Sequence, residues 1–352
     1  MVHVTAAGRS GNLPSERLRR QDRGHAITAP QSGQATASAP DWHPTPRAAG
    51  GAVAVVAAAA AWGSTGTAAH FAPAGASSAS VGAARIALGG ALLLAVGVRT
   101  ADSRQAMARL LAGADRPWQA RAAIVLAAAA IAGYQVTFFT AVRVTGVAVG
   151  TVVAIGSAPV LTGGLTRLSG GPPLGRRWAV ATTAAVAGCV VLVTGGRGAG
   201  VRPEGVLLAL AAGLCYAAYA VAAARLIARG NPETAVMGLL FGGAAVLLTP
   251  VLAESAADWV VTGRGLVVAG YLGVVTTALA YLLYGRGLRT VSAPVAVTIG
   301  LAEPAVAALL GLIVLGERLS GAAVAGLLLI GLALVGLVGR RAAGPLPPGP
   351  PG

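Results

Sequence analysis

The sequence contains no lysine and is poor in charged, histidine and cysteine residues. Charged side chains make up 11% of its 352 residues, against about 25% in an ordinary soluble domain. The four histidines stand at positions 3, 25, 43 and 70, a distribution without metal-ligand spacing. Cys189 and Cys215 both lie inside apolar runs, where we interpret them as small buried side chains. These shortages argue against a soluble enzyme, a bound metal or cofactor, and a disulfide framework.

The basic residues are all arginines, and their positions are informative. They number 26 against 11 acidic residues, which gives a net charge of +15 in a chain that is 55% hydrophobic. Such a charge can indicate a nucleic-acid partner. After residue 47, however, the arginines separate long apolar runs, which is the pattern of loops between membrane spans. We therefore predict a lipid bilayer, and no nucleic acid, as the surroundings of this chain.

Ten apolar runs follow one another between residues 49 and 339, each about as long as the roughly 20 residues that cross a bilayer. Lipid leaves no partner for open backbone groups, so such runs must form helices. The predicted fold is an all-α integral membrane protein with ten transmembrane helices, at 49–70, 79–98, 122–142, 145–167, 178–195, 205–227, 234–253, 265–286, 292–315 and 321–339.

Arginine also predicts the orientation, because short cytoplasmic loops carry the basic excess. Fourteen arginines flank the spans on one side, and five flank the other, namely Arg143, Arg197, Arg202, Arg264 and Arg318. An even number of spans places both termini on one side. We predict a multi-pass protein of the cytoplasmic (inner) membrane with cytoplasmic N- and C-termini.

Both ends of the sequence have the composition of unfolded tails. Residues 1–47 are rich in Arg, Pro, Ser and Gln and contain no apolar core of the kind that a signal peptide has. Residues 340–352, "RRAAGPLPPGPPG", are Pro/Gly-rich. We predict disordered tails at both ends, the first one basic and cytoplasmic, on either side of two five-helix repeats at 48–196 and 204–339.

The two halves resemble each other. At a fixed offset of 145 residues, segment 159–193 aligns with segment 304–338, so that Pro159 matches Pro304 and Gly171 matches Gly316. Five helices is an odd number, so the second repeat must be inverted in the membrane relative to the first. Inverted repeats are typical of transporters whose substrate path lies between the halves near the bilayer midplane.

Four stretches carry a resemblance to a known family. They are "AEPAVAALLGLIVLGERLSG" (302–321), "AWGSTG" (61–66), "GAARIALGGALLL" (82–94) and "AVRVTGVAVGTVVAIGSAPVLTGGL" (141–165). With them the chain resembles the EamA-like branch of the drug/metabolite transporter superfamily from residue 49 to 339. The resemblance implies two inverted five-helix repeats, a central cavity, and movement of small metabolites by alternating access. The first half departs from the pattern, since Ala158 stands in the position of Glu303.

Two charged side chains fall well inside predicted spans, Arg85 in the second and Glu303 in the ninth. A charge at that depth costs roughly 2.5–3.5 kcal/mol on insertion scales, so it normally faces a cavity or a partner. One hypothesis pairs Arg85 with Glu303, and another has Glu303 take up and release a proton during transport. The structural alternatives are that Glu303 accepts hydrogen bonds from backbone amides of a broken helix, and that Arg85 packs between the repeats.

Two prolines inside spans, Pro159 and Pro304, predict paired helix breaks that bend during gating. After the second of these spans, Ser320 is placed to cap the last helix.

Further polar and aromatic side chains lie within the spans, and all of them except Gln135 recur at helical spacing. We predict that they line a solute cavity together with Arg85 and Glu303, and the alternatives are interhelical packing or an interfacial aromatic belt. They are Trp62, Thr65, Gln135, Tyr216, Tyr219 and Tyr281.

The predicted function is secondary transport of a small organic metabolite by alternating access, with efflux as the favoured direction. The solute classes are amino acids, their derivatives and amphipathic drug-like compounds. The sequence has no phosphate-cradling glycine loop followed by lysine, which favours ion coupling or exchange over ATP. The alternative functions are a passive channel or facilitator and, less favoured, a membrane-embedded enzyme.

Overall fold

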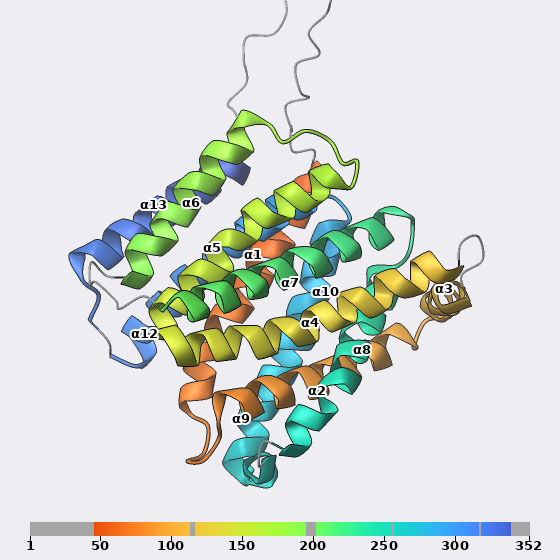
Figure 1. Ribbon diagram of the computed structural model, residues 1–352, viewed down its shortest axis with the longest axis horizontal. Helices are drawn as coiled ribbons and strands as arrows, with labels where there is room; N and C mark the ends of the chain where they lie inside the picture. Colours follow the sequence, from red (N-terminus) through yellow and green to blue (C-terminus); the bar gives the residue numbers. More distant parts are fainter. Residues whose placement is uncertain (1–45, 113–116, 195–201, 255–256, 317, 339–352) are drawn as a thin grey trace, which may run out of the picture. The chain divides into compact units, whose positions relative to one another are not determined.

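The computed structural model describes residues 46–112, 117–194, 202–254, 257–316 and 318–338. These residues belong to one compact unit, and the secondary-structure elements among them are all helices (Figure 1). The predicted tails lie outside the described residues, apart from Pro46 and Arg47, which begin the first helix. Glu317 also lies outside them.

Ten of the described helical stretches are long and apolar enough to cross a membrane, which confirms the predicted fold class. Eight are single helices: α1 Pro46–His70, α2 Ser78–Gly97, α4 Pro117–Thr145, α5 Val147–Leu168, α6 Arg176–Thr194, α7 Pro203–Ala228, α8 Glu233–Glu254 and α13 Gly321–Val338. The eighth span combines α9 Gly263–Gly273, η2 Val274–Leu279 and α10 Ala280–Leu288, and the ninth combines α11 Ala293–Gly300 and α12 Ala302–Val314.

Short hydroxyl side chains begin several of these helices. The Ser77 Oγ accepts a hydrogen bond from the Ser80 backbone N at 3.1 Å and so caps α2. The Ser320 Oγ accepts from the Ala323 backbone N, also at 3.1 Å, which confirms the cap predicted for the last helix. Each cap satisfies one of the amides that a helix start leaves without a partner.

Gly146 separates α4 from α5, whereas the apolar run in the sequence predicts it inside the fourth span. Its φ of 86° lies in the left-handed region, which glycine adopts without steric cost. The fourth span therefore begins at Val147 rather than at residue 145.

Helix α3, Ala101–Ala112, is an element that the count of spans missed. It follows α2 and buries Ser103, Ala106, Met107 and Leu110, which share one face at helical spacing. The Ser103 hydroxyl lies 2.6 Å from the Thr234 hydroxyl at the start of α8. A second short element, the 3-10 helix η1, covers Ala257–Val261.

The eighth span contains a π-helical segment, η2, in its middle. Two fully buried hydroxyls, those of Thr276 and Thr277, both donate to the Leu272 carbonyl oxygen, at 2.8 and 2.9 Å. Segments of this kind are rare and often lie at functional sites.

The ninth span is interrupted at Leu301, three residues before Pro304. Pro304 is thus the third residue of α12, where the N–H that proline lacks has no partner within the helix anyway. The predicted break is present in this span.

The prediction of a helix break at Pro159 in the first half is wrong, because α5 runs through Pro159 without interruption. The Thr162 hydroxyl donates to the Ala158 carbonyl oxygen at 2.7 Å, and the Ser157 hydroxyl donates to the Ala154 carbonyl oxygen at 3.3 Å. Proline removes only the hydrogen bond to the carbonyl one turn before it, that of Ile155, and the rest of the helix continues.

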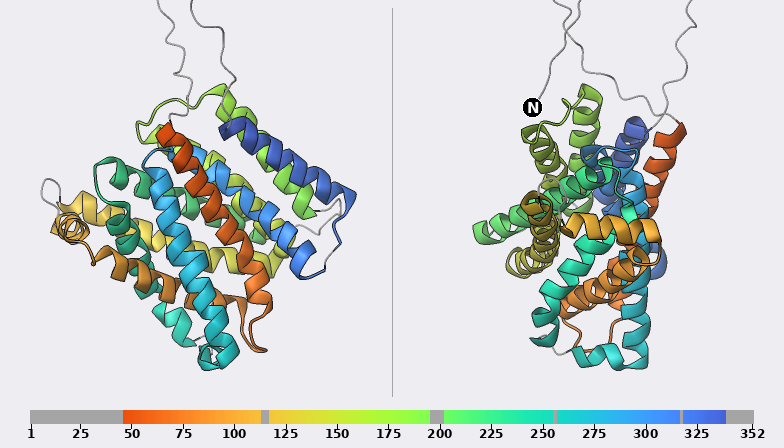
Figure 2. Two further views of the ribbon diagram at one scale, coloured as in Figure 1. Left: turned by 180° about the vertical axis from the view of Figure 1, so that it is seen from behind. Right: turned by 90° about the vertical axis from the view of Figure 1, so that its right-hand side faces the viewer.

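Close helix pairs hold the bundle together. Helix α2 packs along α8, α4 along α7, and α6 along α13 (Figure 1). Seen from behind, α1 lies between α10 and α12 (Figure 2). Small residues permit these approaches: a Cβ on Gly90 of α2 would stand only 2.3 Å from the Phe241 carbonyl oxygen of α8.

Candidate functional site

A cavity lies where six helices converge, three from each half of the chain. The first half contributes α1, α2 and α4, and the second contributes α7, α10 and α12. Its lining consists of aromatic, polar and charged side chains with a single aliphatic one: Trp62, Arg85, Ile131, Tyr134, Gln135, Tyr216, Tyr219, Tyr281 and Glu303. The position between the halves is the one that the inverted repeat predicts for a substrate path.

The structure brings seven of the eight sequence-predicted lining residues to this one cavity. The exception is Thr65, which does not line it. Its hydroxyl is buried and has no hydrogen-bond partner among the described residues. Thr65 follows Trp62 by three residues on α1, so it shares the helix face but lies about one turn further along.

Two lining residues are absent from the predicted set. Ile131 and Tyr134 lie on α4, four residues and one residue before Gln135. The spacing of Ile131 to Gln135 is that of one helix face and could have identified the isoleucine. An aliphatic side chain carries no chemical signal of its own, which is why it was overlooked.

The aromatic rings form a connected wall around the cavity. Trp62 and Tyr281 have ring centroids 5.1 Å apart, and Tyr216 stacks on Tyr219 at 5.3 Å. Tyr134 meets Tyr216 edge to face at 6.1 Å. Such contacts fix the rings, so the hydroxyls are held in place rather than free to turn away.

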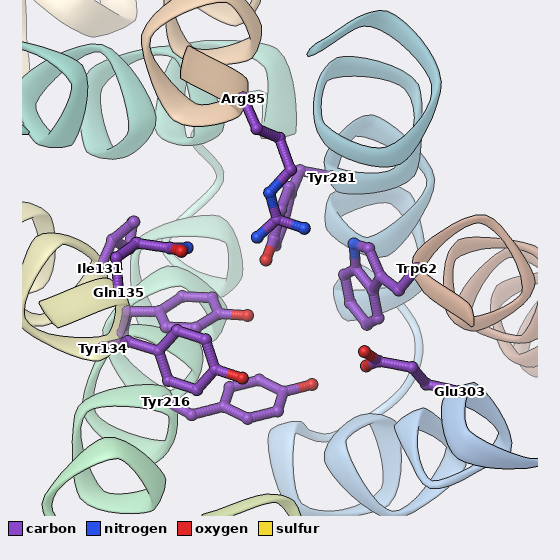
Figure 3. Close-up of a pocket in the computed structure, with 9 residues that line it drawn as sticks. Trp62, Arg85, Ile131, Tyr134, Gln135, Tyr216, Tyr281 and Glu303 are labelled. Carbon is purple, nitrogen blue, oxygen red and sulfur yellow. The ribbon is translucent and has the colours of Figure 1, made fainter. Parts of the chain in front are cut away.

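Arg85 and Glu303 enter the cavity from different helices (Figure 3). Neither side chain has a hydrogen bond or an ion pair with any described residue, so the ion pair considered from the sequence is not formed in this conformation. Both side chains line the same cavity. Hydrogen bonds that involve an ionised donor or acceptor are the strong ones, so each of these two groups can bond strongly to a partner in the cavity.

Glycines bring the backbone close enough to aim these side chains. A Cβ on Gly63 would stand 2.7 Å from the Glu303 carbonyl oxygen and 2.7 Å from the Val306 Cβ, so α1 rests directly on the first turn of α12. At the end of α11, a Cβ on Gly300 would stand 3.1 Å from the Tyr216 hydroxyl oxygen. The missing side chains let α1 approach the backbone at Glu303 and leave room for the Tyr216 hydroxyl.

Two polar groups of the lining lack partners within the protein. The Trp62 side chain is 5% exposed, and its buried Nε1 has no hydrogen-bond partner among the described residues. Gln135 is also 5% exposed, and no described residue bonds its amide. Buried polar groups are normally paired, so these two indicate a site that a ligand or water completes.

The cavity volume is about 40 Å³. A water molecule needs roughly 10–15 Å³ measured in this way, so the space suits about three waters. Organic ligands occupy pockets of about 300–1,000 Å³. The cavity is therefore too small for an organic solute in this conformation.

The described ranges contain no group of three or more His, Cys, Asp or Glu side chains close enough together to hold a metal ion. The chemistry on offer at the cavity is recognition by charge, hydrogen bonding and aromatic contact.

Comparison with known proteins identifies the family. The model of the EamA-like transporter family matches the chain twice, over residues 49–194 and 203–339. A Bacillus subtilis (strain 168) protein named uncharacterized transporter YwfM is 40% identical over 260 residues, which cover 74% of this chain and 83% of that protein.

Two further likenesses are shorter or more distant. The threonine/homoserine exporter RhtA of Salmonella typhimurium is 38% identical over 121 residues, which cover 33% of this chain and 39% of RhtA. One solved crystal structure matches with a TM-score of 0.67 at 23% identity, over 81% of this chain and 95% of that one, and supports the fold. With ten apolar spans and two matches to one family model, this multi-pass membrane protein belongs to the EamA-like transporter family.

Proposed function

We propose that the protein exports a small zwitterionic organic solute, such as an amino acid or a derivative, across the cytoplasmic membrane by alternating access. One observation carries the proposal: Arg85 and Glu303 face one cavity between the halves and do not bond each other. A solute carboxylate can accept hydrogen bonds from Arg85 while its ammonium group donates to Glu303. Arg85 and Glu303 then each bond to a group of opposite charge that belongs to the solute.

The remaining lining suits the rest of such a solute. The rings of Trp62 and Tyr281 offer aromatic faces to an ammonium group or to methylene carbons. The unpartnered Gln135 amide and Trp62 Nε1 can bond further polar groups. A few fixed polar groups in an aromatic wall are typical of sites for small organic molecules.

The relative named threonine/homoserine exporter supports the solute class and the direction, although it matches only a third of this chain. The arginine distribution supports cytoplasmic termini, as predicted from the sequence.

The size of the cavity supports alternating access. A space of about 40 Å³ between two halves widens when the halves move relative to each other. The interruption at Leu301 next to Pro304 provides a bending point in the helix that carries Glu303. When the solute leaves, Glu303 can take up a proton in place of the ammonium group, which couples export to proton entry.

The test is transport by the purified protein in proteoliposomes, with a panel of amino acids that includes threonine and homoserine. We expect saturable transport that responds to an imposed pH gradient. In Glu303→Gln the response to the gradient is expected to disappear, and in Arg85→Gln uptake of carboxylate-bearing solutes should fall sharply. Wild-type rates in both variants would contradict the proposal, and flux that rises linearly with concentration would favour the channel alternative.

A further inference from the structure

We propose that a second cavity, bounded by α2, α4 and α8, is a separate binding compartment for carboxylate-bearing amphipathic molecules, in series with the central cavity. The inference rests on the proposed function, since it assigns this cavity to the same solute before or after it occupies the central site. Three features of the second cavity carry it, namely its volume, a wall shared with the central cavity, and its charge.

The second cavity is large enough to hold an organic solute in this conformation. Its volume is about 540 Å³, against about 40 Å³ for the central cavity. The larger volume falls within the range of about 300–1,000 Å³ of small-molecule sites. It is lined by Ser77, Ser78, Ala79, Ala83, Gln135, Val136, Phe139, Thr140, Val142, Arg143, Leu248 and Val251. Like the central cavity it takes residues from both halves of the chain.

Gln135 belongs to both cavities. The wall beside it includes Phe139, which packs closely against α2 where that helix has a glycine. A Cβ on Gly82 would stand 2.3 Å from the Phe139 ring and 3.2 Å from the Gln135 Oε1. The Phe139 ring and the Gln135 amide thus occupy the room that a larger residue at position 82 would take. In the proposed transfer, rotation of these side chains connects the two spaces.

The outer part of the second cavity favours negative charge. Arg143 lines it, is exposed, and has no hydrogen bond or ion pair with a described residue. Ser78 and Ala79 also line it, and they form the first turn of α2, whose dipole and amides attract anions. None of the lining side chains is acidic. A carboxylate is therefore attracted to one end.

The walls away from Arg143 are mostly apolar, with Val136, Phe139, Leu248 and Val251 among them. An anionic end and an apolar body are together the chemistry of an amphipathic carboxylate. The central cavity differs, because it presents an acid as well as an arginine. During export, a carboxylate released by Arg85 can therefore pass outward to Arg143, where no acid holds the ammonium group.

The experiment measures cysteine labelling in the full chain, purified in lipid nanodiscs so that both faces of the bilayer are accessible. The background carries Cys189→Ala and Cys215→Ala. The test variant is Ala83→Cys, and the matched control is Ala84→Cys. Both alanines are buried, at 2% and 6% exposure, but Ala83 lines the second cavity and Ala84 packs in a hydrophobic cluster with Trp259. The probes are two water-soluble methanethiosulfonates, one with a sulfonate and one with a quaternary ammonium group.

We expect the sulfonate reagent to label Ala83→Cys at least about tenfold faster than Ala84→Cys. When each rate is divided by that reagent's rate with a free thiol in solution, the sulfonate reagent should also react with Ala83→Cys about fivefold faster than the ammonium reagent, which corresponds to an exposed charge interaction of roughly 1 kcal/mol. Arg143→Gln should remove this preference. The control Arg202→Gln, which neutralises another exposed arginine outside the cavity, should keep it.

Equal labelling of Ala83→Cys and Ala84→Cys, or equal rates with the two reagents, would overturn the proposal. Labelling of Ala83→Cys by a lipid-soluble maleimide alone would assign the cavity to lipid and would overturn it as well. Labelling needs no transport, and Arg85→Gln and Glu303→Gln should leave it unchanged. Failure of the central site is therefore distinguishable from failure of this compartment.

Discussion

The two halves carry a proline at corresponding positions of their repeat, and they treat it differently. In the first half α5 continues through Pro159, and the preceding residue, Ala158, is fully buried. In the second half the helix is interrupted at Leu301, and Glu303 precedes the proline at the start of α12, where it lines the cavity. The first turn of a helix tolerates a carboxylate, whereas a packed helix interior does not. The proline is thus a feature of both halves, whereas the acid, Glu303, occurs only in the second half, where α12 begins.

The largest loss of stability is expected when Ala158 of the first half is replaced by glutamate, the residue at the corresponding position of the second half. Ala158→Glu would place an unpaired charge at a site with 0% exposure. A buried charge without a partner costs roughly 3–5 kcal/mol, so the variant should unfold at markedly lower temperature or fail to fold. Thermal unfolding followed by size-exclusion chromatography measures this. Glu303→Ala is the control and should fold like wild type; equal melting temperatures for all three proteins would mean that the two positions do not differ as described.

A smaller loss of stability is expected when a larger residue at position 63 forces α1 away from α12. In Gly63→Ala the new Cβ would meet the Glu303 carbonyl oxygen and the Val306 Cβ, both at 2.7 Å. Overpacking of this kind costs about 1–3 kcal/mol and should also reduce transport by displacing Glu303. On the same helix, a Cβ added to Gly66 would meet nothing within 4 Å, so Gly66→Ala should leave both quantities unchanged. Equal behaviour of the two variants speaks against a tight contact at Gly63.

Replacement of Thr298 in α11 is expected to lower stability by a comparable or slightly smaller amount. Its hydroxyl oxygen lies 3.1 Å from the Trp178 Nε1, which donates to it, and 2.9 Å from the Thr182 hydroxyl. Thr298→Val should cost about 1–3 kcal/mol, because the buried partners lose their bond. Adding Trp178→Phe should then cost less than it does alone, a non-additivity that a double-mutant cycle measures. Strict additivity would show that the hydrogen bond contributes nothing.

The prolines themselves should have the smallest effect on stability. Pro159→Ala returns a backbone donor to a helix that is already continuous, and Pro304→Ala changes a first turn that needs no donor there. We expect changes in unfolding free energy of about 1 kcal/mol or less for both. Transport rates should separate them, with Pro304→Ala altered and Pro159→Ala unchanged. The reverse order would place the bending point in α5.

Much of this architecture follows from the sequence, because the bilayer imposes length and apolarity on each span. The ten spans are predictable on these grounds, and charge at membrane depth together with polar and aromatic residues at helical spacing selects most of the cavity lining. The parts that were missed have physical reasons. Helix α3 is only 12 residues long and carries charge, so a search for apolar runs passes over it. In the π-helical segment η2, the Thr276 and Thr277 hydroxyls donate to the Leu272 carbonyl oxygen. Hydroxyl residues also occur in ordinary helices, so the sequence does not identify the segment.

The prediction for Thr65 shows the limit of spacing arguments. Trp62 and Thr65 share a helix face, but a cavity that accommodates about three waters does not extend along a whole turn of α1. The size of the cavity depends on how the aromatic rings pack against one another across helices, and the sequence does not contain that information in any local pattern.

In the proposed mechanism, Arg85 and Glu303 hold opposite ends of one solute. The most direct measurement compares KM in proteoliposomes for three forms of a transported amino acid: the free compound, its amide, which lacks the carboxylate, and its N-acetyl derivative, which lacks the ammonium group. Loss of one buried charged partner costs about 2 kcal/mol or more, or roughly thirtyfold in affinity. Arg85→Gln should raise KM by that factor for the free amino acid and not for the amide, and Glu303→Gln should raise it for the free amino acid and not for the N-acetyl form. Equal loss for all three compounds in both variants would contradict the claim.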